Sequence, residues 1–182
     1  MFKQRRWKSA LADHELAVRS FVATCQRITP AEWHRSPGSG KWSPAEVSLH
    51  VCRTYELGRE ALAGGESMRL RVSERYAWWL RTLMMPVIIA TKRFPRGAPA
   101  PREVWPDAAQ LKLFTQETAA LRLGRVSAEV AAGLHRSAGK RGPLRFTHAY
   151  FGALTPYSTL RLLAAHTRHH ERGLGYATAP RR

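Results

Sequence analysis

Residues 155–173 contain both the start and the stop signals of one complete helix. Thr155 is a suitable N-cap, and Pro156 fits the first helical position, where its missing N–H has no helical partner to lose. Gly173 can adopt the left-handed conformation that ends many helices. The polar and apolar residues between these signals follow a helical period, so the chain must supply other elements that cover the apolar face.

The rest of the chain supplies further helical patterns and no strand-length alternation. Ser43-Pro44-Ala45-Glu46 is a capping box with proline at the first helical position, and Pro86 should kink the segment that contains it. Helices are predicted over residues 9–28, 44–63, 67–94 and 107–134, with a proline-rich connector over residues 94–107. We therefore predict an all-α, single-domain four-helix bundle over residues 1–182, with a core of about 11–174, short basic termini and an extra irregular helical segment at 67–94.

Histidines stand at core-facing positions of two predicted helices. His166 and His170 are spaced i, i+4, about one turn apart, so both imidazoles can bind one divalent ion. His50 lies on the apolar stripe of the helix that begins at Pro44. A single inward histidine is more often a hydrogen-bonded core residue, but three on two helices favour a metal site. His14 is a weaker fourth candidate, for which a partly exposed position near a helix start is the simpler interpretation.

The composition is strongly basic but does not single out a partner. The 182 residues include 30 Lys and Arg against 13 Asp and Glu, giving a net charge of +17. Such a charge favours nucleic acid or another acidic partner, although the arginines are scattered and form no dense tract, so nucleic-acid binding is the minority interpretation. Cys25 and Cys52 are expected as reduced, buried thiols. The longest uncharged stretch of the middle, residues 82–91, is too short for a membrane span, and a soluble cytoplasmic protein is expected.

Three motifs make the chain resemble the DinB-like superfamily, the metal-binding four-helix bundles that include the damage-inducible DinB proteins and the YfiT-type proteins. With the helix order, the resemblance extends over residues 11–174. The motifs are Gly40-Lys41-Trp42-Ser43-Pro44 leading to His50, then His148-Ala149-Tyr150-Phe151-Gly152-Ala153-Leu154-Thr155, and His166-Thr167-Arg168-His169-His170.

The resemblance implies a divalent metal, most often zinc or nickel, with iron and manganese as alternatives. The family's ligands are one histidine of the second helix and two spaced i, i+4 on the last, which match His50, His166 and His170. His169 points about 100° away from its neighbour and is interpreted as a supporting residue behind the ligands or a surface residue. A glutamine often stands three residues after the last histidine in the family, where this chain has Gly173.

Three neutral imidazoles leave a metal position open for water or substrate, as in catalytic zinc sites. The resemblance implies hydrolysis of an amide-like bond or transfer of a low-molecular-weight thiol onto a small-molecule substrate. Glu46 is a candidate general base, although its place in the capping box explains it equally well, and Tyr150 is a candidate donor to substrate or a core residue. A non-catalytic metal-binding or stress-response module remains the alternative. The apolar segment 67–94 makes a homodimer plausible.

Overall fold

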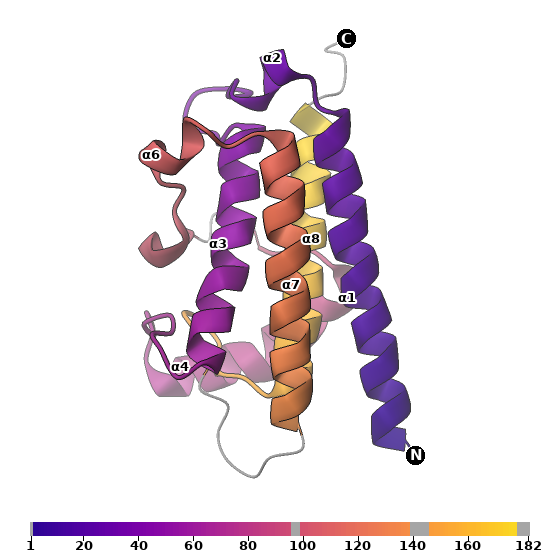
Figure 1. Cartoon of the computed structure of the whole chain (residues 1–182). Helices are drawn as coiled ribbons and strands as arrows, with labels where there is room; N and C mark the ends of the chain where they lie inside the picture. Colours follow the sequence, from indigo (N-terminus) through magenta and orange to yellow (C-terminus); the bar gives the residue numbers. More distant parts are fainter. Residues whose placement is uncertain (1, 96–98, 139–145, 178–182) are drawn as a thin grey trace.

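The computed structural model describes residues 2–95, 99–138 and 146–177, and these residues form an all-α bundle. In Figure 1 the long helices stand side by side, with α2 at one end of the bundle and α4 at the other. The bundle helices are α1 (Phe2–Arg27), α3 (Pro44–Leu62), α7 (Gln116–Ala138) and α8 (Pro156–Ala177). The shorter elements are α2 (Pro30–Trp33), α4 (Glu74–Trp79), the π-helical turn η1 (Leu80–Met84), α5 (Met85–Thr91), the 3₁₀ turn η2 (Arg102–Val104), α6 (Ala108–Leu111), β1 (Thr147–His148) and β2 (Gly152–Ala153).

The first and last helices, α1 and α8, are parallel neighbours. Asp13 pairs with Arg168 at 2.7 Å, and Thr24 donates to Glu171 at 3.5 Å. A residue further along α1 therefore contacts a residue further along α8, as in parallel helices. In contrast, α7 runs antiparallel to α1, because its first residue, Gln116, donates to the carbonyl of Ile28 just past the end of α1. The first and the last helix of the chain are thus neighbours in the bundle (Figure 1).

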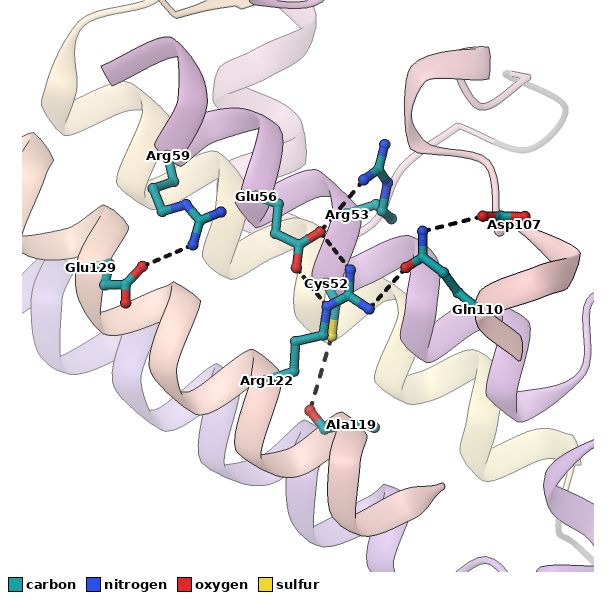
Figure 2. A network of polar contacts seen from close by, with 9 residues as sticks. All are labelled: Cys52, Arg53, Glu56, Arg59, Asp107, Gln110, Ala119, Arg122 and Glu129. Carbon is teal, nitrogen blue, oxygen red and sulfur yellow. Dashed lines mark hydrogen bonds and ion pairs between the residues drawn. The ribbon is translucent and has the colours of Figure 1, made fainter. Parts of the chain in front are cut away.

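The pair α3 and α7 is also parallel, and a polar network ties the two helices together (Figure 2). Cys52 lies opposite Ala119 and Glu56 opposite Arg122. The Arg122 guanidinium donates to both carboxylate oxygens of Glu56, at 2.5 Å and 2.7 Å, and to the side-chain oxygen of Gln110 at 3.0 Å. Such a bidentate pair fixes the register of the two helices and also fastens α6 to them.

The bundle core is apolar and closely packed. Trp33 and Tyr55 are among its largest fully buried side chains, and the Trp33 indole N–H donates to the carbonyl of Phe114 at 2.6 Å. Cys25 and Cys52 are free and buried, as expected, and burial raises the pKa of their thiols to about 11 and about 12. Both thiols are therefore protonated at neutral pH and act as small apolar residues. None of the described helices is long and apolar enough to cross a membrane.

The predicted helix over residues 67–94 is shorter in the structure, where it begins at Glu74. Ser67 hydrogen-bonds instead to the backbone of Thr147, and the Arg71 N–H donates to the carbonyl of Ala149 at 2.8 Å. These bonds hold the segment, which is not helical, beside the β1–β2 hairpin, and the Ser73 hydroxyl then caps α4 by accepting from the Tyr76 N–H. The irregularity expected at Pro86 takes the form of the π-helical turn η1, which ends two residues earlier.

The predicted helix over residues 107–134 is divided into α6 and α7. Thr115 and Thr118 cap the start of α7 reciprocally: the Thr115 N–H donates to the Thr118 hydroxyl at 2.8 Å, and the Thr118 N–H to the Thr115 hydroxyl at 3.2 Å. This local cap competes with a continuous helix and explains the break. The glycine-rich loop predicted around Gly139 and Gly142 lies outside the described residues.

The last helix begins as predicted but does not end at Gly173. The Thr155 hydroxyl accepts from the Ser158 N–H at 3.2 Å, which confirms the N-cap. Helix α8 continues to Ala177 because Leu174, only 2% exposed, packs in the bundle core. The free energy gained by burying the Leu174 side chain exceeds the preference of Gly173 for ending the helix, so the next turn stays helical.

Candidate metal centre

Three histidine side chains from α3 and α8 converge between these two helices. The Nε2 atom of His166 lies 3.3 Å from Nε2 of His50 and 3.1 Å from Nε2 of His170. One ligand atom of each histidine lies within 4.8 Å of those of the other two. The i, i+4 spacing on α8 thus places two imidazoles on one face, and α3 presents the third opposite them.

A backbone carbonyl fixes the orientation of the His50 ring. Its Nδ1 lies 2.9 Å from the carbonyl oxygen of Val104, in η2. A carbonyl can only accept a hydrogen bond, so the proton of the His50 imidazole is on Nδ1 and the lone pair is on Nε2. That lone pair faces His166. Histidine ligands of metal ions commonly have this support from the second ring nitrogen.

The three imidazoles are neutral at physiological pH. Burial lowers the pKa of His50 to about 4, and it lowers the pKa of His166 and His170 well below the usual range, helped by the mutual repulsion of the rings when charged. Neutral rings keep lone pairs available for a metal ion. A protonated cluster would bring like charges together in a buried place.

The spacing of the nitrogens fits one divalent ion. Bonds of about 2.0–2.1 Å from zinc to imidazole nitrogens, at angles of about 90–110°, place the nitrogens about 2.9–3.4 Å apart. The two measured Nε2–Nε2 separations, 3.3 Å and 3.1 Å, fall in this range. In addition, the buried Nδ1 of His166 has no hydrogen-bond partner among the described residues. The donor set and these two separations are therefore compatible with one bound metal ion.

A cavity of about 510 Å³ opens over the three histidines. Its walls come from α3, α8, the connector after α5 and the β1–β2 hairpin. The apolar and aromatic lining includes Trp42, Met68, Phe94, Trp105 and Phe146. A cavity of this size accommodates a small organic molecule.

The other sequence candidates lie in different environments. Glu46 accepts from the Ser43 N–H at 2.7 Å in a complete capping box, and it is not among the residues that line the cavity. Tyr150 lines the cavity, with its hydroxyl donating to the carbonyl of Pro99 at 2.9 Å. His169 also lines the cavity, and its Nδ1 accepts weakly from the Phe94 N–H at 3.5 Å.

His14 is not part of the histidine cluster, and the partly exposed position expected for it is wrong. The side chain is 1% exposed, and its Nε2 lies 3.0 Å from the hydroxyl of Tyr55. The prediction failed because α1 begins at Phe2, not at residue 9, so His14 lies in the middle of the helix. The Tyr55 hydroxyl also contacts the Thr167 hydroxyl at 3.0 Å, which links α1, α3 and α8 through the core.

Sequence reasoning missed two contributors to the site. The Val104 carbonyl is a backbone atom in the proline-rich connector, and no side-chain pattern marks it. His148 was noticed only as part of a family motif, although the structure places it in the wall of the cavity. The position of His148 directly before a tight turn was the sequence signal that could have indicated it.

The fold and the site together define a helical bundle with a candidate metal-binding centre between two of its helices. The family model of the DinB superfamily matches residues 14–172, and the chain belongs to this superfamily, as its motifs predicted. The matched range includes all three clustered histidines. No curated protein and no solved structure matches the chain.

Proposed function

We propose that this DinB-superfamily protein binds one divalent ion, zinc or nickel, through His50, His166 and His170, and that it is an enzyme transferring a low-molecular-weight thiol. The observation that carries the proposal is the convergence of three neutral imidazole nitrogens at the base of a cavity. A divalent ion held there would lower the pKa of a coordinated thiol, so that the nucleophilic anion forms at neutral pH.

Thiol transfer suits the cavity better than hydrolysis. No Asp or Glu is found among the described residues that line the cavity, so no carboxylate is placed to take a proton from an attacking water. In the transfer reaction the thiol loses its proton to solvent, and a sulfur lone pair forms a bond to an electrophilic carbon. The electron pair of the broken bond departs with a leaving group such as a halide, so thiol and alkyl halide give thioether and acid.

The protein's own residues would bind and orient the reactants. Val104 holds the His50 ring in one tautomer, and the aromatic walls exclude water from the reacting atoms. Because the histidines are neutral, the occupied site keeps the full charge of the ion and favours an anionic ligand.

Metal content of untagged protein, measured by elemental mass spectrometry, tests the proposal. We expect about one ion per chain in the wild type and none in the His166→Ala/His170→Ala double variant, with helical content preserved in both. Thiol consumption with an alkyl halide should follow the metal content. Wild-type protein that stays empty after incubation with zinc, nickel, iron and manganese would refute the metal site. Metal-loaded protein without thiol transfer would favour the non-catalytic alternative. Salt-dependent nucleic-acid binding that the double variant retains would favour a function of the basic surface in binding nucleic acid.

A further inference from the structure

His148 is held in one tautomer by the turn between β1 and β2. Its Nδ1 accepts hydrogen bonds from the backbone N–H groups of Tyr150, at 3.2 Å, and Phe151, at 3.4 Å. A nitrogen that accepts from N–H donors carries a lone pair, so the ring proton is on Nε2. The Phe151 ring stacks against the imidazole, with the centroids 4.7 Å apart, and fixes its plane.

The turn itself is anchored from outside. The Thr147 N–H donates to the Ser67 hydroxyl at 2.7 Å, and the Arg81 guanidinium donates to the carbonyl of Phe151 at 3.0 Å. Arg81 lies in η1, and Ser67 precedes α4, so two separate segments hold the hairpin. His148 is therefore a preorganised side chain.

His148 lines the cavity that also contains the three histidines of the candidate metal centre, His50, His166 and His170. No described residue accepts a hydrogen bond from its Nε2. Burial lowers the pKa of His148 to about 4, so at neutral pH the side chain is an uncharged N–H donor.

The cavity has no formal charge on its described walls. None of the described lining residues is Asp, Glu, Lys or Arg, and most are apolar or aromatic. A charged group on a ligand would lose its hydration there without gaining an oppositely charged partner, except at the metal centre. The walls thus favour a ligand with one anionic end and an uncharged body.

We infer that the cavity binds a thiol whose body is apolar and uncharged, and that the His148 Nε2–H hydrogen-bonds to its thiolate. This inference rests on the proposed function, because the thiolate would be a ligand of the metal ion. It assigns His148 as a ligand-binding residue and names the class of thiol, neither of which follows from the three-histidine cluster alone.

Two thiols of matched shape test the ligand class on wild-type protein. Phenylmethanethiol and 4-(mercaptomethyl)benzoate share a benzylic thiol and differ in one carboxylate at the far end of the ring. With cobalt(II)-loaded protein, the sulfur-to-cobalt charge-transfer band reports thiolate binding directly. We expect phenylmethanethiol to bind at least about tenfold more tightly, because the carboxylate would enter an uncharged cavity. Equal or tighter binding of the carboxylated thiol would overturn the inference.

His148→Asn tests the donor while preserving the turn. The asparagine oxygen replaces Nδ1 as the acceptor for the two backbone N–H groups, but no N–H reaches the position of Nε2. We expect unchanged cobalt content and phenylmethanethiol binding weakened about 10-fold or more, as for loss of a hydrogen bond to a charged atom. His135→Asn, which removes an exposed histidine of α7, is the matched control and should bind like the wild type.

The outcomes separate this inference from the proposed function. If the wild type and His148→Asn both take up cobalt and bind phenylmethanethiol equally well, the role of His148 is refuted and the metal site stands. Wild-type protein that takes up no cobalt would refute both. If His148→Asn fails to fold, the matched thiols still decide the ligand class on the wild type alone.

Discussion

Helix α3 carries a polar cluster on each of two sides, and the clusters differ in how their hydrogen bonds are completed. Toward α7, the Glu56 carboxylate receives two bonds from Arg122, whose third bond goes to Gln110, which in turn donates to Asp107 at 3.3 Å (Figure 2). Each group in this chain of contacts has a protein partner. The network is complete as it stands.

Toward α8, the histidine cluster is not complete without a further group. His50 directs a lone pair at His166, whose Nε2 also faces His170, and the Nδ1 of His166 is buried without a partner among the described residues. The Nε2 atoms of these neutral rings lie together without a charged protein group among them, and such a set of nitrogens could hold a metal ion. The comparison separates a polar network that ties two helices together from a cluster of nitrogens that could hold a metal ion.

The strongest test of the comparison is the effect of zinc on stability. At a zinc concentration about a thousandfold above its Kd, we expect the free energy of unfolding to rise by about 4 kcal/mol, because the ion binds the folded state alone. The His166→Ala/His170→Ala variant should lose this gain, and Glu56→Gln should keep it. Urea titrations with and without zinc measure both. A gain that survives in the double variant would show that zinc binds elsewhere.

Removal of one partner of the complete network should destabilise the fold and spare the metal centre. For Glu56→Ala we expect a loss of about 2–3 kcal/mol, since Arg122 keeps some access to water and the cost lies below that of a fully buried charge. The urea midpoint measures the loss, and metal content should stay at the wild-type level. The double variant Glu56→Leu/Arg122→Met should recover much of the stability. A drop in metal content in Glu56→Ala would contradict the separation of the two clusters.

A third polar group, at His14, should make the metal-free protein sensitive to acid. Burial lowers the pKa of His14 to about 4 from 6.5 in the unfolded chain, so the unfolded state binds more protons between these values. Stability therefore falls as the pH drops through this window, by about 2 kcal/mol between pH 7 and pH 5 for this residue. His14→Gln retains a polar partner for Tyr55 and should flatten the pH dependence by that amount, measured by urea unfolding at both pH values. An unchanged slope would place the acid sensitivity in other groups.

The smallest effect is expected for the exposed end of the α3–α7 interface. Arg59 and Glu129 pair at 3.2 Å, but both side chains are 42% exposed. Arg59→Ala should change the free energy of unfolding by less than about 0.5 kcal/mol, because water screens such pairs. Urea unfolding of Arg59→Ala and Glu56→Ala, measured side by side, compares an exposed and a less exposed ion pair of the same interface. A loss as large as that of Glu56→Ala would mean that surface pairs also fix the helix register.

The sequence predicts those parts of the molecule that depend on local signals. The capping box at Ser43 and Glu46 forms as expected, and α8 begins at Pro156 as expected, because caps involve residues only a few positions apart. The spacing of His166 and His170 follows from the helical period. The apolar stripe of α3 also marks His50 as an inward-facing candidate, but no local pattern specifies which helices become neighbours.

The failures have physical causes that lie outside local patterns. The break before α7 depends on two threonine hydroxyls competing with the helix, and the continuation of α8 past Gly173 depends on the burial of Leu174. Likewise, the Val104 carbonyl reaches His50 only because the connector folds back over α3. Tertiary packing decides each of these features.

The parallel pairing of α1 with α8 has a consequence for how the protein folds. Contacts between these helices join residues near opposite ends of the chain; those between Ser20 and Glu171 span 151 positions. The His50–His166 contact spans 116 positions. Closing such long loops is entropically costly, so a bundle with this connectivity should fold more slowly than one whose successive helices are all antiparallel neighbours. The histidine cluster is complete only after that closure, and an ion would therefore slow unfolding more than it speeds folding.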